Sequence, residues 1–529
     1  MMDFQLTLPA LLRRAETYFP NREIVSRLPD RSFQRTTYGE LGTRVRRLGA
    51  ALQQLGLERG DRVATLAWNH NAHYEAYFGI PCAGFVLHTL NLRLHPNDLA
   101  YIANHAGDRA VIVDRALVPL LEQFRDRTQL EHVFVVEDSY EELLAGADPS
   151  AYRDPELRET EASAMCYTSG TTGLPKGVVY SHRSTVLHSL AQALIKPLGF
   201  SVTERDALMP VVPMFHAMAW GYPYTCAMMG AKLVFPGPHL DAESLLEDIA
   251  QEGVTVSAGI PTVWLGMLGL LDREPDRFDL SSLRSMLVGG SAAPRSLIAG
   301  FRQRHGVQIV HGWGMTETSP LASASDYVGD LHDADEETQL DFVAMQGLPL
   351  PFVEFRGRDA AGCPIPWDGE SMGELEVRGP WVAASYYETP EQADRWTEDG
   401  WLRTGDIVTI HPLGYIRIKD RSKDVIKSGG EWISSVELEN TLMGHPAVAE
   451  AAVIAMPDER WGERPLAVVV LREGMTTTSE ELCGYLAPHF PKWWLPDRFE
   501  FVDAIPKTGV GKFLKSALRA QFAQQETTE

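Results

Sequence analysis

The sequence of 529 residues is poor in cysteine, in basic residues and in uninterrupted apolar runs. Its five cysteines, at positions 82, 166, 226, 363 and 483, include no pair at C-x-x-C spacing, which excludes the usual short metal or redox motif. We interpret them as reduced thiols of a cytoplasmic protein. The segment MMDFQLTLPALLRRAETYF at the N-terminus lacks the basic start and the long apolar stretch of a signal peptide.

Acidic residues outnumber basic ones: the chain has 71 Asp and Glu but 48 Lys and Arg, which gives a formal net charge of −23. A field of that sign repels nucleic acid and anionic lipid, so an anionic ligand has to be held by local donors. Residues 207–231 contain no Asp, Glu, Lys or Arg, but Pro210, Pro213 and Pro223 interrupt them. We predict a buried pocket wall there and no integral membrane segment.

The chain is longer than one hydrophobic core usually supports, so we expect at least two domains. Apolar residues at helical spacing over 41–57, 118–128 and 243–253 are each followed by a strand-like run, at 61–68, 132–138 and 254–259. Such alternation predicts an α/β fold of parallel-rich sheets covered by helices. From about residue 350 the pattern changes to strands and turns, as at 373–380 and 414–421, which predicts a strand-rich subdomain.

Charge and glycine cluster at 419–434, between two patterned regions, which is typical of a boundary. We predict a large N-terminal domain over 1–420, a hinge at 421–424 and a small mobile α+β domain over 425–529. In the small domain the pattern predicts a helix at 435–445, strands at 448–456 and 465–473, a helix at 479–490 and a short tail. The acidic stretch at 329–341 is expected to be a solvated loop.

One stretch, YTSGTTGLPKGVVYSHR at 167–183, combines glycines, hydroxyl side chains and one lysine. Glycines allow a tight turn whose N–H groups bind anions, and the hydroxyls and the lysine add donors. The adjacent Gly-Lys-Ser/Thr of the common P-loop is missing, so an ordinary ATPase or GTPase loop is disfavoured. An ordinary hairpin loop is the alternative to polyphosphate binding. The residues predicted to hold the phosphates are Thr168, Ser169, Gly170, Thr171, Thr172, Gly173 and Lys176.

YTSGTTGLPKG resembles the signature of the acyl-adenylate-forming superfamily of acyl-CoA synthetases, adenylation domains and luciferases. GWGMTETSP at 312–320, RTGDI at 403–407, KDRSKDVIKSGGEWIS at 419–434 and IPKTGVGK at 505–512 follow in the order of that superfamily. The resemblance spans nearly the whole chain and is strongest to bacterial long- or medium-chain fatty acyl-CoA synthetases. It implies that ATP activates a carboxylate as an acyl-adenylate, from which the thiol of CoA then displaces AMP.

The resemblance also implies roles for single residues. Glu317, assisted by Thr168, would bind Mg²⁺, and Asp406 would accept both ribose hydroxyls through its two carboxylate oxygens. The residues predicted to be catalytic are Lys512, Thr316, Glu317, His216 and Lys176. Further predicted contacts with the nucleotide or CoA are Gly290, Ser291, Ala292, Gly312, Trp313, Gly314, Met315, Arg421, Lys423, Lys427 and Trp432. Lys512 would bridge the two reacting anions after closure of the small domain, and a hinge at Lys423 would then reopen the site for the thiol.

The acid is predicted from the uncharged run VVPMFHAMAWGYPYTCAMMGA at 211–231 and from a second apolar wall at 256–271. Neither contains a cation for a second carboxylate, so we predict a fatty acid of medium or long chain. The residues predicted to border the acid or the pantetheine arm are His216, Ala217, Trp220, Gly429 and Gly430. Trp220 would be a gate to the acyl tunnel or, in the simpler interpretation, a packed core tryptophan. HAMAWGYPY departs from the HVNAW-type segment of the nearest relatives, which leaves the chain length open.

Three alternative functions stay open. The first is a CoA ligase for a short thioether or aryl acid, which would share every motif except the pocket. The second is a non-catalytic relative that binds nucleotide or acyl groups, against which the catalytic-type residues argue. The third is an adenylation module that loads a separate carrier protein. We also expect a homodimer, and an oily substrate would be compatible with peripheral contact at a membrane surface.

Overall fold

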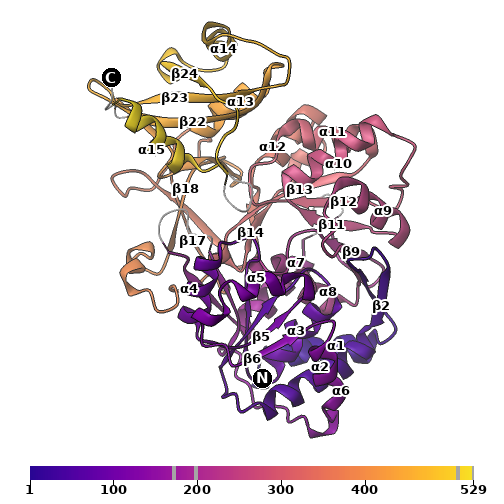
Figure 1. Ribbon diagram of the computed structural model, residues 1–529. Helices are drawn as coiled ribbons and strands as arrows, with labels where there is room; N and C mark the ends of the chain where they lie inside the picture. The colour runs from indigo at the N-terminus through magenta and orange to yellow at the C-terminus, as the bar shows by residue number, and fades with distance from the viewer. Residues whose placement is uncertain (169–173, 196–199, 430, 508–512, 527–529) are drawn as a thin grey trace. The chain divides into compact units, whose positions relative to one another are not determined.

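The computed structural model describes residues 1–168, 174–195, 200–429, 431–507 and 513–526, and Figure 1 labels their helices and strands. The chain divides into two compact units. Unit 1 comprises Met1–Glu354 and Arg378–Leu402, and unit 2 comprises Phe355–Val377 and Arg403–Glu529. The predicted hinge at 421–424 concerns movement and stays a prediction.

Nine strands of the described residues form the larger sheet of unit 1, in the order β15-β14-β13-β12-β11-β9-β10-β1-β2. The strands from β13 to β1 in this order are parallel, whereas β2, β14 and β15 are antiparallel to their neighbours. Their bounds are β1 Glu23–Arg27, β2 Phe33–Thr37, β9 Ala207–Pro210, β10 Lys232–Phe235, β11 Val256–Gly259, β12 Ser285–Val288, β13 Gln308–Gly314, β14 Leu321–Ala324 and β15 Leu348–Pro349.

Six further strands in the described part of unit 1 form a second sheet, in the order β6-β5-β3-β4-β7-β8. All neighbours in it are parallel except β7 and β8, which form an antiparallel hairpin. The bounds are β3 Arg62–Leu66, β4 Val86–Thr89, β5 Asp108–Val113, β6 His132–Val135, β7 Ala162–Tyr167 and β8 Gly177–Ser181. The predicted strands at 61–68, 132–138 and 254–259 correspond to β3, β6 and β11, so the predicted α/β class is confirmed.

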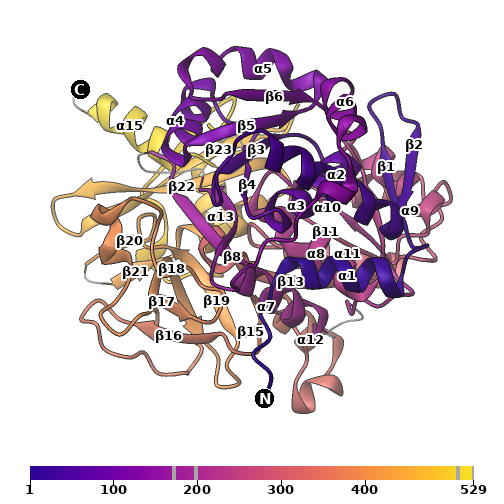
Figure 2. The ribbon, with the colours of Figure 1, turned by 90° about the horizontal axis from the view of Figure 1, so that it is seen from below.

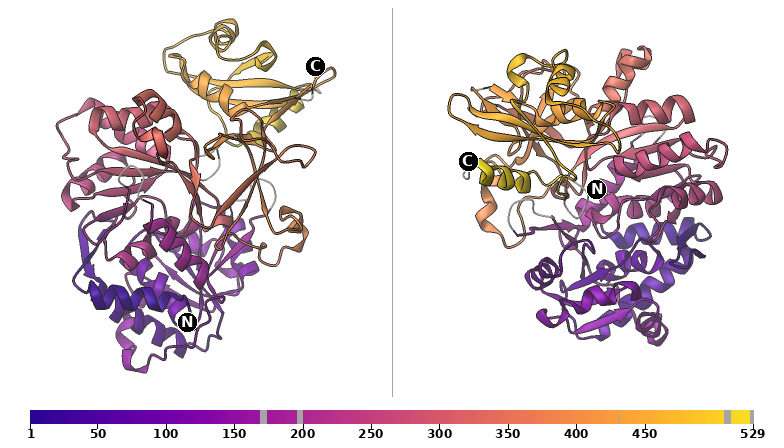
Figure 3. Two further views of the ribbon diagram at one scale, coloured as in Figure 1. Left: turned by 180° about the vertical axis from the view of Figure 1, so that it is seen from behind. Right: turned by 45° about the horizontal axis from the view of Figure 1, so that its top comes forward.

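Helices cover both sheets, which explains why the parallel strands are almost continuously apolar. Beside the larger sheet, α9 Ala242–Glu252, α10 Pro261–Arg273, α11 Arg295–His305 and α12 Glu336–Ala344 lie together in Figures 1 and 3. Figure 2 shows α4 and α5 along β5 and β6 of the second sheet. The other helices of unit 1 are α1 Leu8–Tyr18, α2 Tyr38–Gln54, α3 Asn71–Cys82, α4 Pro96–Ala106, α5 Val118–Glu122, α6 Ser139–Gly146, α7 His182–Ala193 and α8 Tyr222–Met229.

The expectation of a solvated loop over the acidic stretch 329–341 is wrong for its second half, where α12 begins. The Asp335 side chain caps this helix by accepting a hydrogen bond from the backbone N–H of Thr338 at 2.8 Å. Leu340 and Val343, three residues apart, are buried in the core with α11. The acidic residues occupy the opposite, exposed face, so charge content alone concealed an amphipathic helix.

Unit 2 contains a four-stranded sheet and a five-stranded sheet among its described residues. The first has the order β16-β17-β18-β19, with bounds β16 Glu354–Arg358, β17 Gly373–Arg378, β18 Leu402–Ile410 and β19 Ile416–Arg421. The second has the order β21-β20-β23-β22, and β24 pairs with β23. Its strands and helices are β20 Ile426–Ser428, β21 Glu431–Ile433, α13 Ser435–Met443, β22 Val448–Asp458, β23 Gly462–Leu471, α14 Ser479–Leu486, β24 Arg498–Phe501 and α15 Lys515–Glu526.

The predicted short tail is wrong, because the chain after α14 adds β24 and the helix α15. Leu518 and Phe522, one helical turn apart, pack on Ile454 and Leu466 of the long β22–β23 hairpin. Lys515 also fixes this helix, since its Nζ lies 2.5 Å from Glu439 Oε1 and donates to Ser435 Oγ at 2.6 Å. Burial alone would lower the pKa of Lys515, but Glu439 and nearby Asp420 raise it, so the lysine stays charged.

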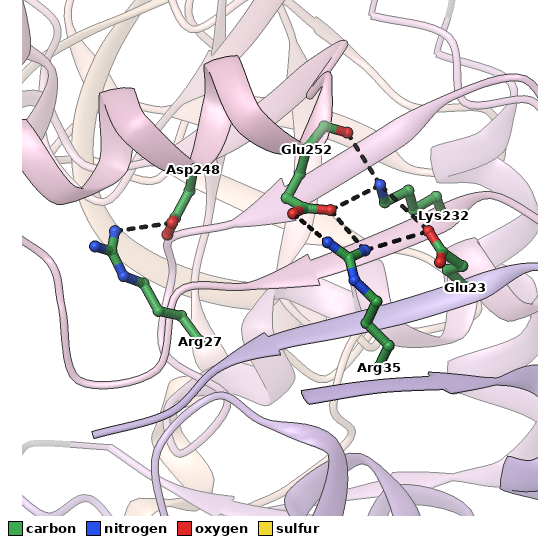
Figure 4. Close-up of polar contacts among 6 residues, drawn as sticks. All are labelled: Glu23, Arg27, Arg35, Lys232, Asp248 and Glu252. Carbon is green, nitrogen blue, oxygen red and sulfur yellow. Dashed lines mark hydrogen bonds and ion pairs between the residues drawn. The ribbon is translucent and has the colours of Figure 1, made fainter. Parts of the chain in front are cut away.

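A cluster of ion pairs holds the N-terminal hairpin β1–β2 beside α9 and β10 (Figure 4). Arg27 Nη1 lies 2.8 Å from Asp248 Oδ1, and the Asp248 side chain is fully buried. Burial raises the pKa of Asp248 to about 7 against the opposing effect of Arg27. Close by, Glu252 pairs with Arg35 at 2.7 Å and with Lys232 at 2.9 Å. The carboxyl groups of α9 therefore depend on cations that the sheet supplies.

Replacing Arg27 with Met is expected to lower the free energy of unfolding by about 3 kcal/mol, because Asp248 stays buried without a cation. The control is Glu23→Gln, which removes two longer pairs of a half-exposed carboxylate, with Arg35 at 3.4 Å and with Lys232 at 3.5 Å, while both cations keep Glu252 as a partner. This variant is expected to cost less than about 1 kcal/mol. Urea denaturation followed by tryptophan fluorescence measures both. Equal midpoints for the two variants would contradict the importance assigned to the buried pair.

Candidate active site

The candidate site of unit 1 lies on segments that follow strands. β9, β11, β12 and β13 run parallel in one sheet, so the segments after them leave from the same edge. In parallel sheets ligands bind outside this carboxyl edge. These segments contain residues that the sequence selected: His216, Ala217 and Trp220 after β9, Gly290 to Ala292 after β12, and Met315 to Glu317 after β13.

The glycine-rich loop joins β7 to β8 in the neighbouring sheet. The hairpin fixes both of its ends, since the Thr168 N–H donates to the Lys176 carbonyl at 2.9 Å and the Lys176 N–H donates to Thr168 Oγ1 at 3.4 Å. Five predicted phosphate contacts lie outside the described residues: Ser169, Gly170, Thr171, Thr172 and Gly173. Lys512 and Gly430 lie outside them too.

Lys176 and Glu317 both meet the segment Ala383–Trp396. Lys176 Nζ donates to Gln392 Oε1 at 2.5 Å and lies 5.2 Å from the centre of the Tyr386 ring. Burial, and after it Arg395, lower the pKa of Lys176. The hydroxyl of Tyr386 donates to Glu317 Oε1. Burial and the charge of Glu317 raise the pKa of Tyr386, so this hydroxyl keeps its proton.

The segment from Gly312 to Thr316 is fixed by close backbone contacts. A Cβ atom on Gly314 would lie 1.8 Å from the carbonyl oxygen of Pro320, so only glycine fits there. The hydroxyl of Tyr180 donates to the carbonyl of Thr316 at 2.7 Å and ties this turn to β8. Trp313, a predicted contact with the nucleotide, is 6% exposed. Its role and those of exposed Gly290, Ser291 and Ala292 stay predictions.

The oxygen atoms of Glu317 and Thr168 in unit 1 suit a magnesium site. Among the described residues, no group of three or more His, Cys, Asp or Glu side chains is arranged around a common point that could hold a metal ion. Glu317 offers a single carboxylate that is 5% exposed, and Thr168 offers a half-buried hydroxyl. Mg²⁺ usually binds through one or two carboxylates together with phosphates and water, so these residues fit it.

A strained turn forms the side of the site where the acid is predicted to bind. Five consecutive residues, from Ala217 to Gly221, have positive φ angles between 44° and 81°, a conformation that costs an L-residue roughly 1–2 kcal/mol. Gln192 holds the turn, since its side-chain amide donates to the Trp220 carbonyl at 2.8 Å and accepts from the Thr225 hydroxyl at 2.6 Å. Half-buried His216 precedes the turn, and its carbonyl accepts from the Ala219 N–H at 3.2 Å.

The turn places Trp220 against the glycines after β12. A Cβ atom on Gly289 would lie 3.1 Å from the Trp220 ring, and one on Gly290 would lie 3.9 Å from it. The same Gly289 position is 3.1 Å from the carbonyl of Gly312 in β13, so the turn, the segment after β12 and strand β13 meet at this point. The indole is only partly buried. It therefore borders the segment that follows β12, where the nucleotide is predicted to bind.

The other predicted site residues belong to unit 2. Asp406 is 1% exposed, and its Oδ1 lies 3.0 Å from Nε of Arg421, its partner in the β18–β19 pairing. Lys427 and Trp432 face each other across the β20–β21 hairpin. Gly429 has a φ of 63° and supports Trp461, whose ring would lie 2.8 Å from an added Cβ atom. Lys423 is exposed.

Two protein-family models match this chain. The model of the AMP-binding enzymes matches residues 12–387, and the model of the AMP-binding enzyme C-terminal domain matches residues 437–512. This chain belongs to the AMP-binding enzyme family.

The AMP-binding enzyme is 50% identical to a long-chain-fatty-acid–CoA ligase of Thermus thermophilus, over 99% of this chain and 96% of the relative. It is 45% identical to a 3-methylmercaptopropionyl-CoA ligase of Ruegeria lacuscaerulensis, over 99% and 98%. A crystal structure of the anthranilate CoA ligase AuaEII with anthranoyl-AMP superimposes with a TM-score of 0.86 at 26% identity, covering 98% of each chain. The predicted resemblance to acyl-adenylate-forming enzymes is confirmed.

Sequence reasoning missed the residues that hold the site together. Tyr386 and Gln392 lie in SYYETPEQADRW, a segment between strands without a recognisable pattern, and only its aromatic content could have drawn attention. Gln192 and Thr225 come from two helices, and nothing in their sequence spacing connects them. His188, whose pKa burial lowers to about 3, accepts from the Leu321 N–H at 3.1 Å behind the turn and is therefore a neutral structural residue.

Gly221 provides a test of the strained turn. An added Cβ atom would lie 2.7 Å from Nδ1 of fully buried His188, so Gly221→Ala is expected to lower the free energy of unfolding by about 3 kcal/mol and to impair use of the acid. Gly253 ends α9 with a φ of 62° and has open space where its Cβ atom would be. Gly253→Ala is therefore the matched control, with a cost of about 1 kcal/mol and unchanged kcat/KM. Urea denaturation and acid kinetics measure the two effects, and equal behaviour of both variants would contradict the packing argument.

Proposed function

We propose that this AMP-binding enzyme is an ATP-dependent ligase that joins a medium- or long-chain fatty acid to CoA. The observation that carries the proposal is the joint anchoring of Lys176 and Glu317 by one tyrosine in the unit that also contains the uncharged wall at 207–231. A cation and a carboxylate suit a polyphosphate with its metal, and the uncharged wall suits an alkyl chain. The long-chain ligase at 50% identity supports the same acid class.

The proposed reaction has two steps. A carboxylate oxygen of the acid bonds to the α-phosphorus of ATP while the bond to the bridging oxygen breaks, so pyrophosphate leaves. The sulfur of CoA then bonds to the acyl carbon, its proton is released, and AMP leaves. The first step brings two anions together, so positive charge and hydrogen-bond donors have to be concentrated there. Lys176 would hold the leaving phosphates, and Lys512 would bridge the carboxylate and the α-phosphate.

The other residues would hold the substrates. Glu317, with Thr168, would bind Mg²⁺, which when bound neutralises charge on the phosphates. Thr316 would contact the α-phosphate, and Asp406 would accept the ribose hydroxyls. The nucleotide would also contact Arg421, Lys423 and the segments at 290–292 and 312–315. Gly429 and Gly430 would leave room for the pantetheine arm, with Lys427 and Trp432 beside them.

The acid would lie between the turn and the segments after β11 and β12. Met214, Phe215 and Met218 there are 0–3% exposed and supply adaptable apolar surface. His216 and Ala217 would border the carboxylate end. The second candidate is a CoA ligase for a short thioether acid, supported by the Ruegeria relative and by the Trp220 ring against Gly289, which would shorten the pocket unless it moves.

A cytoplasmic location and a homodimer complete the proposal. In the described residues, no helix combines the length and the apolar character needed to cross a membrane. The three most buried cysteines, Cys82, Cys166 and Cys226, carry thiols whose pKa burial raises, which suits inert reduced thiols. Gel filtration with light scattering would test the homodimer.

A panel of saturated acids from acetate to palmitate, with 3-(methylthio)propionate and benzoate, tests the function through pyrophosphate release with and without CoA. Each methylene that the pocket buries contributes about 0.8 kcal/mol, so kcat/KM is expected to rise about fourfold per methylene up to the depth of the pocket. A preference for the thioether acid or for benzoate would favour the second candidate or an aryl acid. Release without acyl-CoA formation would indicate a carrier protein, and no release with any acid would indicate a non-catalytic binder.

Lys512 separates the two half-reactions. Lys512→Ala is expected to slow pyrophosphate release about 10²- to 10³-fold, because a charge that stabilises the transition state is lost. Thioester formation from supplied acyl-adenylate should stay within about twofold of the wild-type rate. Both rates are measured on the same preparation by chromatography of acyl-CoA and by a coupled pyrophosphate assay. An equal loss of rate in both steps would contradict the assignment of Lys512 to the first step.

A further inference from the structure

The segment Ala383–Trp396 forms backbone hydrogen bonds next to both charged groups of the candidate site. The Ala383 N–H donates to the Glu317 carbonyl at 2.7 Å, next to the proposed metal-binding carboxylate. The Tyr387 N–H donates to the Gly177 carbonyl at 2.8 Å, one residue after Lys176. One short stretch of backbone is therefore hydrogen-bonded to β8 and to the turn after β13. Strands β8 and β13 belong to different sheets.

Tyr386 projects from this segment and contacts both charged side chains. Its hydroxyl donates to Glu317 Oε1, and its ring centre lies 5.2 Å from Lys176 Nζ. The tyrosine is 7% exposed. Trp396 packs edge-on against its ring at 5.2 Å, and the indole N–H of Trp396 donates to the Ala383 carbonyl at 2.7 Å. Packing and the backbone bonds thus fix the direction of the ring and of its hydroxyl.

The physical problem at this point is that Lys176 and Glu317 attract each other. A direct ion pair would neutralise both groups and would compete with phosphate and metal for them. Tyr386 offers each a weaker partner: a hydroxyl donor for the carboxylate and an aromatic face for the ammonium group. Gln392 adds a neutral acceptor for Lys176 at 2.5 Å. Both charged groups stay ordered, and the tyrosine hydroxyl can keep orienting Glu317 while a metal is bound.

We propose that Tyr386 is a positioning residue that holds Glu317 and Lys176 separately in place for the metal and the phosphates of ATP. This inference rests on the proposed function, because it assigns those two residues to the nucleotide. The metal-binding glutamate is oriented by the tyrosine hydroxyl, while the ring acts on the lysine. Loss of the hydroxyl alone should therefore weaken metal binding more than binding of metal-free nucleotide.

The test is Tyr386→Phe, which keeps the ring and its packing on Trp396 but removes the hydroxyl. The apparent Mg²⁺ concentration for half-maximal pyrophosphate release should rise about tenfold, with KM for the acid within about twofold of wild type. A second readout does not depend on turnover: free Mn²⁺ is titrated by electron paramagnetic resonance into enzyme with ATP and no acid. The dissociation constant of Mn²⁺ should rise by a similar factor.

Tyr140→Phe is the matched control, because the Tyr140 hydroxyl also donates to a buried carboxylate, Glu75, at 2.7 Å between helices of unit 1. It should lower the melting temperature without changing Mn²⁺ binding. Trp396→Phe, which loses the hydrogen bond to Ala383, should shift Mn²⁺ binding in the same direction as Tyr386→Phe but less. Mn²⁺ binding by Trp396→Phe therefore tests the inference if Tyr386→Phe does not fold.

Unchanged Mn²⁺ and Mg²⁺ dependence in a folded Tyr386→Phe enzyme overturns the inference and leaves Tyr386 a structural residue. If Tyr386→Phe is insoluble, unchanged Mn²⁺ binding in Trp396→Phe overturns the inference. A wild-type protein that releases no pyrophosphate with any acid overturns the proposed function instead. An active wild type beside a metal-insensitive Tyr386→Phe variant overturns this inference alone.

Discussion

The parallel direction of β9, β11, β12 and β13 is the constraint on which the candidate site depends. Because these strands run the same way, the segments that follow them start at one edge of the sheet. The turn with Trp220, the glycines at 289–290 and the turn with Glu317 can meet there although up to about 100 residues separate them. Helices that cover the sheet hold its strands in place, so the segments that follow these strands start from rigid positions.

The charge distribution creates a second requirement. A chain with a formal charge of −23 has to assemble a site for polyanions, so its few cations there must not be neutralised by neighbouring carboxylates. Elsewhere in unit 1 cations and carboxylates pair directly, as Arg27 and Asp248 do. At the candidate site neutral groups stand next to the charges instead, since Tyr386 contacts Glu317 and Gln392 contacts Lys176. Direct ion pairs of the first kind stabilise the fold. Charged groups with neutral partners, as at the candidate site, stay available for a ligand.

Backbone geometry adds the third element. The left-handed turn from Ala217 to Gly221 stores strain that the hydrogen bonds of Gln192 and Thr225 offset. Gly314 permits a backbone approach that any side chain would block, and a side chain at Gly289 would crowd the Trp220 ring. Under the proposed function, specificity for the acid would depend on how a rigid environment holds one turn, as well as on the apolar side chains around it.

The sequence by itself determined the α/β class, the family and the identity of the charged residues, because alternating apolar patterns and short ordered motifs are local properties of the chain. It did not reveal α12, where burial of Leu340 and Val343 outweighs a run of acidic residues, nor α15, where Leu518 and Phe522 need the β22–β23 surface to pack on. Only the tertiary structure decided that Tyr386 meets both Lys176 and Glu317, and that Gln192 supports the turn with Trp220. Such contacts join residues far apart in the chain, so packing creates them and no local pattern encodes them.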